Sequence, residues 1–177
     1  EAIYGTERKI ITINMSEYKE AHKVSSLIGS PPGYVGYGEG GRLTEQVRRN
    51  PYSVLLLDEM EKAHPDVQEL FLQVFDKGSL TDSEGLEINF KNLIIIMTSN
   101  LGARKIAEYC KKNKEIKIEE LSQLIKESLL DSFKPEFLGR INVIPYLSLS
   151  DDMLHQIIEI QLNKIKHRLQ ENYKIEF

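Results

Sequence analysis

Two short apolar runs, each followed by a polar tip, constrain the fold of this chain more than any other feature. The first occupies residues 53–57 and leads into Asp58 and Glu59, and the second occupies residues 93–97 and leads into Asn100. Neither run alternates between apolar and polar residues, which is typical of strands buried on both faces of a parallel sheet. We therefore expect two strands of one parallel sheet, each ending in polar side chains.

The segment between these strands has the pattern of a helix. Pro65 suits the first helical turn, and Gly78 suits the position just after the last turn. Apolar residues recur between them at helical spacing, namely Val67, Leu70, Phe71, Val74 and Phe75. A helix that connects two parallel strands predicts an α/β fold, and we expect a three-layer sandwich around a central parallel sheet.

The remaining sequence predicts further elements and a second, smaller domain. Strands are expected at residues 9–15 and 142–146, a helical turn from Ser16, a short or irregular helical segment at 20–27, and helices at 42–49, 103–112 and 118–133. A long helix is expected from Ser150 to near Tyr173, with a last strand from Lys174. We expect residues 1–149 to form one large domain and residues 150–177 to begin a small domain that is cut off early.

Composition argues against several classes of function. The formal net charge of −4 provides no basic stripe for nucleic acid. No apolar stretch approaches the roughly 20 residues that span a bilayer, and the start of the sequence lacks the basic and apolar regions of a signal peptide. Cys110 is the single cysteine, which rules out an intrachain disulfide and suits a reducing cytosol. We therefore expect a cytoplasmic protein that binds neither membrane nor nucleic acid.

The acidic pair after the first strand is a candidate catalytic site. Ligands bind at the carboxyl ends of parallel strands, and there one carboxylate suits Mg²⁺ while the other suits activation of a water molecule. If the two strands are neighbours, the amide of Asn100 lies beside Asp58 and Glu59 and is able to orient that water. Taken singly, a solvated acidic turn and a turn-forming asparagine explain these residues about equally well.

Two further segments carry unusual composition. Arg140 ends the segment Phe-Lys-Pro-Glu-Phe-Leu-Gly-Arg, and a guanidinium on a helix end can neutralise charge on a phosphoryl group held by a neighbouring subunit. An ordinary surface arginine is the simpler explanation of that residue alone. Residues 30–41 hold five glycines and two prolines in twelve positions, which predicts a loop and no regular element.

Together, these residues resemble the AAA+ modules of the Clp unfoldase class, and specifically the second ATPase module of a ring-forming motor. The resemblance extends over essentially all 177 residues. It implies ATP and Mg²⁺ as cofactors, with Asp58 on the metal and Glu59 as the base that activates water. It also implies that Asn100 is the first sensor and that Arg140 is an arginine finger acting in trans within a homo-hexamer.

The same resemblance gives the glycine-rich segment a mechanical role. Gly33-Tyr34-Val35-Gly36 resembles the axial pore loop that holds a threaded polypeptide. An exposed aromatic ring grips side chains without sequence specificity, and the glycines let the loop move. The alternative is a rigid loop whose Tyr34 packs inward. Residues 77–85 fall where a second pore loop is placed in this class, although a polar hairpin explains them equally well.

Within the Clp class, the sequence most resembles the ClpV branch, the ATPases of bacterial type VI secretion. The resemblance lies in residues 11–22, 24–27, 73–78, 137–140 and 143–146. It implies that the polypeptide substrate is a subunit of the contracted secretion sheath. The rival is a general ClpB-type disaggregase. A ClpA- or ClpC-type feeder of a peptidase is disfavoured, because the Ile-Gly-[Leu/Phe] docking tripeptide is absent, so no peptidase partner is expected.

The sequence also departs from the family pattern. It contains no Gly-x-x-x-x-Gly-Lys-[Ser/Thr] loop for phosphate, and the Gly-Ala-Arg of the second sensor, expected later in the small domain, is also missing. We expect residues 1–5 to be the end of the helix that follows the phosphate loop. Residues 1–177 alone are therefore expected to bind ATP poorly and to hydrolyse none. A nucleotide-independent interaction fragment is the non-enzyme alternative.

Overall fold

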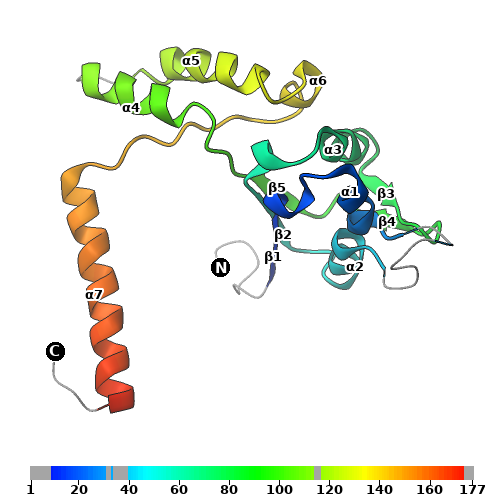
Figure 1. Ribbon diagram of the computed structural model, residues 1–177, viewed down its shortest axis with the longest axis horizontal. Helices are drawn as coiled ribbons and strands as arrows, with labels where there is room; N and C mark the ends of the chain where they lie inside the picture. The colour runs from blue at the N-terminus through cyan, green and yellow to red at the C-terminus, as the bar shows by residue number, and fades with distance from the viewer. Residues whose placement is uncertain (1–8, 31–32, 34–39, 114–116, 174–177) are drawn as a thin grey trace.

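A three-stranded parallel sheet lies at the centre of the computed structural model, which describes residues 9–30, 33, 40–113 and 117–173 (Figure 1). Strand β2 (Val54–Asp58) lies between β1 (Ile10–Asn14) and β5 (Ile94–Met97). Leu55 pairs with a residue of each neighbour, Ile11 and Ile95. The expected α/β class and the parallel arrangement of these three strands are confirmed.

Short helices connect the strands, and their ends follow from local chemistry. Helix α3 begins at Pro65, where the missing N–H leaves no donor unsatisfied, and the ring nitrogen of His64 accepts a hydrogen bond from the backbone of Asp66. The helix ends at Gly78, whose φ of 70° is left-handed. The elements of this part are the 3₁₀ turn η2 (Met15–Tyr18), α1 (Ala21–Ile28), α2 (Arg42–Arg49), the 3₁₀ turn η3 (Met60–Lys62) and α3 (Pro65–Lys77).

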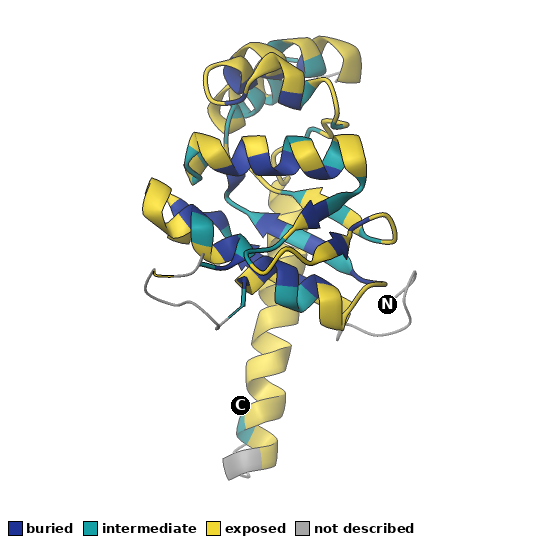
Figure 2. Cartoon of the chain, turned by 90° about the vertical axis from the view of Figure 1, so that its right-hand side faces the viewer, coloured by how far each residue is buried: buried dark blue, intermediate teal, exposed yellow. Residues whose placement is uncertain are grey.

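The hydrophobic core lies on one face of the sheet. Ile13, Leu55 and Leu57 are fully buried there, in one cluster with apolar residues of α1, α2 and α3. Full burial of one such side chain contributes about 1.5–3 kcal/mol to stability. This cluster fixes the sheet relative to its helices, and Figure 2 shows the buried positions gathered around the strands.

The other face of the sheet is partly exposed, which corrects one expectation. The side chains of β2 alternate between buried and intermediate, and on β5 Ile94 and Ile96 are 36% and 46% exposed. Burial of these strands on both faces is therefore wrong for the described part of the chain. A continuous apolar run allows a strand to be buried on both faces. Burial itself requires an element packed on each face, and no described helix packs on the exposed face of this sheet.

A hairpin and a helical layer complete the body of the molecule. Strands β3 (Ser79–Thr81) and β4 (Glu87–Asn89) follow α3, and α4 (Ala103–Lys112), α5 (Ile118–Leu130) and α6 (Pro135–Leu138) form the layer above α3 in Figure 1. The ring of Phe137 lies 5.7 Å from that of Phe75 and 5.6 Å from that of Phe133. These contacts hold α6 against α3. The helix expected at 118–133 ends earlier, and its last residues lead to Lys134, which Pro135 keeps extended.

For the carboxyl-terminal part of the chain, one sequence prediction is correct and one is wrong. Residues 142–146 form no strand, and Ile144 and Tyr146 are 76% and 86% exposed. An apolar, β-branched segment becomes a strand only beside a free sheet edge, and this one runs apart from the sheet (Figure 1). The long helix is confirmed as α7 (Asp151–Tyr173), which lies away from the other elements.

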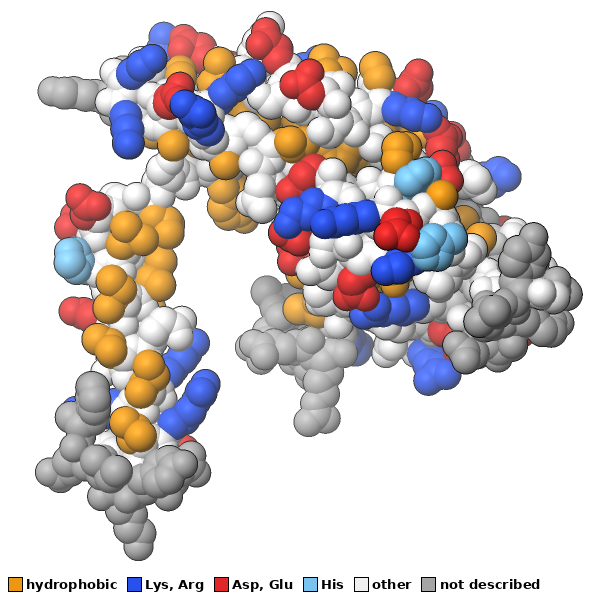
Figure 3. Space-filling view, in the orientation of Figure 1, with side chains coloured by type: hydrophobic (Ala, Val, Ile, Leu, Met, Phe, Trp, Pro, Cys, Tyr) orange, Lys and Arg blue, Asp and Glu red, His pale blue; other side chains and the backbone are white. Residues whose placement is uncertain are grey.

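Helix α7 exposes apolar side chains along its length (Figure 3). They are Met153, Leu154, Ile157, Ile158, Ile160, Leu162 and Ile165. The division into domains at residues 149 and 150 stays a prediction, and the last expected strand falls outside the described residues. No helix of the described part is long and apolar enough to cross a membrane.

Candidate functional site

Polar residues from three strands meet at the carboxyl edge of the sheet. Asn14, the last residue of β1, pairs in register with Asp58, the last residue of β2. On the other side, the backbone N–H of Thr98 donates to the carbonyl of Leu57 at 3.0 Å, and the N–H of Met60 donates to the carbonyl of Thr98 at 3.0 Å. Pairing between the second and third strands therefore continues past their ends and brings Thr98 to the acidic pair.

Thr98 connects the two acidic residues. Its hydroxyl donates a hydrogen bond to Oδ1 of Asp58 and accepts one from the backbone N–H of Glu59 at 3.1 Å. No described residue bonds the second carboxylate oxygen of Asp58. The site thus has an oriented carboxylate with one oxygen free. Sequence patterns did not identify this role of Thr98, which depends on the register of β2 and β5.

Glu59 is held in a strained backbone conformation. Its φ of 58° and ψ of 46° are left-handed, and it is the only residue other than glycine with positive φ in the described ranges. Such a conformation costs of order 1–3 kcal/mol and persists where surrounding contacts impose it. Here two hydrogen bonds to Thr98 impose it, one from the backbone N–H of Glu59 and one from that of Met60. Strain of this kind is common at functional sites.

The carboxylate of Glu59 forms an ion pair with Lys62, three residues along the chain. The hydrogen bond to Glu59 raises the pKa of Lys62, whose ammonium group stays charged. Only one oxygen of Glu59 takes part in this pair, so the other remains available to accept a proton. Lys62 is a second contact that the sequence analysis missed, although its spacing on a helical turn was visible.

Asn100 lies at the same edge, but it contacts a different acidic residue than expected. Its backbone N–H donates to Oε1 of Glu61 at 3.3 Å, and its side-chain amide bonds no described residue. Strands β2 and β5 are neighbours, as expected, so Asn100 is close to the segment that follows Asp58. The second oxygen of Glu61 is buried with no hydrogen-bond partner in the part that the structure describes.

Arg140 lies far from this edge, at the opposite end of α3. Its Nε and Nη2 donate to the two carboxylate oxygens of Asp76 at 2.7 and 3.2 Å, and its Nη1 donates to the carbonyl of Glu136 at 2.9 Å. The hydrogen bond to Asp76 raises the pKa of Arg140. Helix α3 spans 13 residues, or about 20 Å at about 1.5 Å per residue, and it begins after the acidic pair and ends beside Arg140. No contact recorded among the described residues joins Arg140 to Asp58 or Glu59.

The candidate pore loop is described only at Gly33, because Tyr34, Val35 and Gly36 lie outside the described residues. Gly33 is exposed with a φ of 90°, and a Cβ added there would meet nothing within 4 Å. No residue that the structure describes would therefore contact a side chain at this position. The conformation of Gly33 is one that glycine adopts more readily than other residues.

The base of this loop is packed tightly against the hairpin of β3 and β4. A Cβ on Gly29 would lie 2.2 Å from the hydroxyl of Ser83, and one on Gly41 would lie 2.4 Å from the backbone of Ile28. The N–H of Ser83 also donates to the carbonyl of Ile28 at 3.0 Å. These contacts join the Ile28–Gly29 end of the loop to the hairpin and bring Gly41, at the other end, against Ile28.

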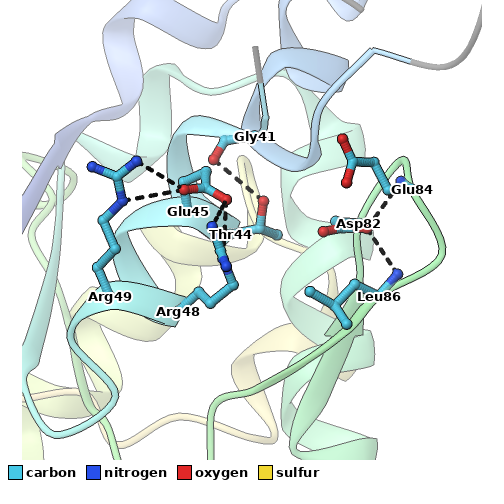
Figure 4. A network of polar contacts seen from close by, with 8 residues as sticks. All are labelled: Gly41, Thr44, Glu45, Arg48, Arg49, Asp82, Glu84 and Leu86. Carbon is cyan, nitrogen blue, oxygen red and sulfur yellow. Dashed lines mark hydrogen bonds and ion pairs between the residues drawn. The ribbon is translucent and has the colours of Figure 1, made fainter. Parts of the chain in front are cut away.

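The hairpin turn and the start of α2 lie side by side in Figure 4. In the turn, Oδ1 of Asp82 accepts hydrogen bonds from the backbone of Glu84 and Leu86, each at 2.9 Å. In α2, the carboxylate of Glu45 pairs with both Arg48 and Arg49. The polar hairpin expected for residues 77–85 is thus observed, at the base of the candidate pore loop. Its use as a second pore loop stays a prediction.

The donor atoms at the sheet edge suit Mg²⁺ bound together with phosphates. Carboxylates of Asp58 and Glu59 and the hydroxyl of Thr98 offer only oxygen, which this ion prefers. No group of three His, Cys, Asp or Glu residues able to hold a metal by itself occurs among the described residues. Mg²⁺ is commonly held by one or two carboxylates, with water and substrate phosphates completing the shell. The residues present fit that pattern.

Comparison with known proteins agrees with this geometry. Residues 1–144 match the family model described as AAA domain (Cdc48 subfamily). The chain is 55% identical over 178 aligned residues to AAA+ ATPase ClpV1 of Pseudomonas aeruginosa, covering all of this chain and 20% of that protein. It is 52% identical to chaperone protein ClpB of Yersinia enterocolitica, covering 99% of this chain and 20% of that protein. The chain thus spans about one fifth of the length of these relatives.

Proposed function

Because the chain belongs to the AAA domain family of the Cdc48 subfamily, we propose that the complete protein is an ATP-driven unfoldase. Its fold is that of a Clp-type AAA+ module. The observation that carries the proposal is the bonding of Thr98 to both Asp58 and Glu59 at the carboxyl edge of the parallel sheet. This arrangement holds an acidic pair where such sheets bind phosphates.

Each residue at the edge has a distinct task in the proposed hydrolysis. Bound Mg²⁺-ATP supplies the phosphoryl group and a metal charge that neutralises its oxygens. The free oxygen of Asp58 holds the metal, and the oxygen of Glu59 that Lys62 leaves available accepts the proton of the attacking water. The amide of Asn100, which bonds no described residue, orients that water.

The position of Arg140 supports action between subunits of a homo-hexamer. Its guanidinium is exposed and is separated from its own acidic pair by the length of α3. Charge on a transferring phosphoryl group is therefore neutralised by the arginine of a neighbouring subunit. A ring also places the segment Gly33-Tyr34-Val35-Gly36 of each subunit around a common axis, where Tyr34 grips the polypeptide.

The proposed substrate is a subunit of the contracted type VI secretion sheath, and the proposed location is the cytoplasm. The resemblance to the ClpV branch supports this choice over nucleic acid, membrane or a peptidase partner. Identities of 55% and 52% separate the ClpV and ClpB relatives only slightly, so general disaggregation by a ClpB-type chaperone is the second candidate. Co-purification of sheath subunits with the complete protein tests the first against the second.

Substitution of the proposed base tests the enzymatic part of the proposal. In the complete protein, Glu59→Gln is expected to keep nucleotide binding and to lower turnover by about 10²–10⁴-fold, because an amide does not accept the proton of water. ATPase rate and nucleotide affinity are measured together, with Glu119→Gln on the exposed surface of α5 as a control that should change neither. Turnover within about threefold of the unsubstituted protein contradicts the role of Glu59.

A further inference from the structure

We propose that Asp76 is a positioning residue for Arg140, a role that rests on the proposed function of Arg140 in trans. Asp76 lies in the last turn of α3 and bonds both Nε and Nη2 of the guanidinium. With the carbonyl of Glu136 on Nη1, three of the five N–H groups are occupied. One N–H on each terminal nitrogen remains for a phosphate of the neighbouring subunit.

The bidentate contact restricts the guanidinium more than a single hydrogen bond does. Two parallel N–H···O bonds set the plane of the group as well as its position. A free arginine samples many rotamers, and ordering it at the moment of reaction opposes catalysis. Asp76 therefore orders the guanidinium of Arg140 before it contacts the phosphate of the neighbouring subunit.

The charge of Asp76 is unfavourable for its own helix. The carboxyl end of a helix carries partial negative charge, so an acidic residue in the last turn is destabilising unless a cation neutralises it. Lys77 in the same turn is one such cation, and Arg140 supplies another, which contacts the carboxylate directly across 64 residues of sequence. A residue that is unfavourable for its own helix is expected where its side chain has a role in a functional site.

The surrounding contacts make this a fixed geometry. The side chain of Gln68 on α3 bonds both Ser132 and Lys134 through backbone atoms, at 2.9 and 3.1 Å. Glu69, also on α3, forms an ion pair with the side chain of Lys134. The segment that carries Arg140 is thus attached to α3 at two places, one at Gln68 and Glu69 and one at Asp76.

Glu69 provides a matched control for Asp76. Both are exposed acidic residues of α3 that pair with a base of the same segment, but only Asp76 contacts Arg140. In the complete protein, Asp76→Asn is expected to lower kcat for ATP about 10- to 100-fold through a misplaced guanidinium. KM should stay within about twofold, because Arg140 acts on the transition state. Glu69→Gln should change neither constant, because the bonds of Gln68 to the backbone of Ser132 and Lys134 still attach the segment to α3.

A double substitution separates positioning from general stability. In an Arg140→Ala background, Asp76→Asn should lower kcat no further, because the group that it orients is gone. Equal effects of Asp76→Asn and Glu69→Gln on kcat, or a further loss in the Arg140→Ala background, overturn the role of Asp76. If Arg140→Ala itself leaves ATP turnover unchanged, the proposed function of Arg140 is wrong and this inference falls with it.

Discussion

At the scale of single residues, Thr98 holds the acidic pair in place. Thr98→Val keeps the shape of the side chain but removes the donor to Asp58 and the acceptor for Glu59. Hydrogen bonds to charged groups contribute about 1.5–3 kcal/mol, and solvent exposure here favours the lower end. We expect ATP turnover of the complete protein to fall about tenfold.

Two neighbouring substitutions control this prediction. Thr98→Ser retains the hydroxyl and should keep most of the turnover. Ser99→Ala changes the adjacent residue, whose hydroxyl accepts a hydrogen bond from the backbone N–H of Leu101 and bonds no other described residue, and should leave turnover unchanged. If Thr98→Val is as active as Ser99→Ala, the hydroxyl of Thr98 does not position the carboxylates.

Sequence patterns identified the acidic residues but not the residues that hold them. Asp58 and Glu59 follow an apolar run, which is a local signal. Thr98 is next to Asp58 only because of the register between β2 and β5, and Asp76 meets Arg140 only because α6 packs on α3. Contacts between residues distant in sequence need the tertiary structure, so a single sequence does not reveal them.

At the scale of elements, the glycine-rich loop at residues 30–41 is distinguished by close packing at its base. A Cβ on Gly41 would meet backbone atoms of α1 at 2.4–2.5 Å, and backbone does not yield as a flexible side chain does. Gly41→Ala is expected to destabilise this region by about 1–3 kcal/mol. Hydrogen–deuterium exchange in the complete protein should increase at 21–28 and 42–49.

A glycine in the hairpin turn provides the control for this element. Gly85 has a φ of 82° and open space around its Cα, so Gly85→Ala introduces backbone strain of about 1 kcal/mol and no collision. Exchange should then increase only near the turn. If Gly41→Ala leaves hydrogen–deuterium exchange at 21–28 unchanged, the stability of the two helices does not depend on the close contact between Gly41 and α1.

Element prediction succeeded where the pattern was local and failed where burial depended on partners. The three parallel strands, α3 and α7 follow from apolar runs, helical spacing and end signals such as Pro65 and Gly78. Burial of the sheet on both faces and the strand at 142–146 did not follow, because each requires a neighbour that sequence patterns do not reveal. The four-residue helix α6 was too short to give a periodic signal.

At the scale of the whole molecule, substitution of Arg140 tests whether ATP hydrolysis in one subunit depends on its neighbour. Arg140→Ala should lower hydrolysis by a ring of substituted subunits about 10³–10⁵-fold and leave the nucleotide affinity of an isolated subunit unchanged. In mixed rings, each substituted subunit should silence the neighbouring site that its arginine faces, while its own site works beside an unsubstituted arginine. ATPase rate measured against the fraction of substituted subunits distinguishes these roles. Loss confined to the subunit that carries the change contradicts action in trans.

The central claim is that ATP hydrolysis pulls a polypeptide through the ring, and Tyr34 tests it most directly. Its proposed contact is with the translocating chain, and no role in ATP hydrolysis is proposed for it. The measurement is unfolding of a tagged model substrate alongside the ATPase rate of the complete protein. Tyr34→Ala should abolish unfolding while hydrolysis stays within about threefold, and Tyr34→Phe should retain much of both, because the grip depends on the ring. Loss of both activities in Tyr34→Ala, together with a lower melting temperature, contradicts the account, because Tyr34 is then a core residue.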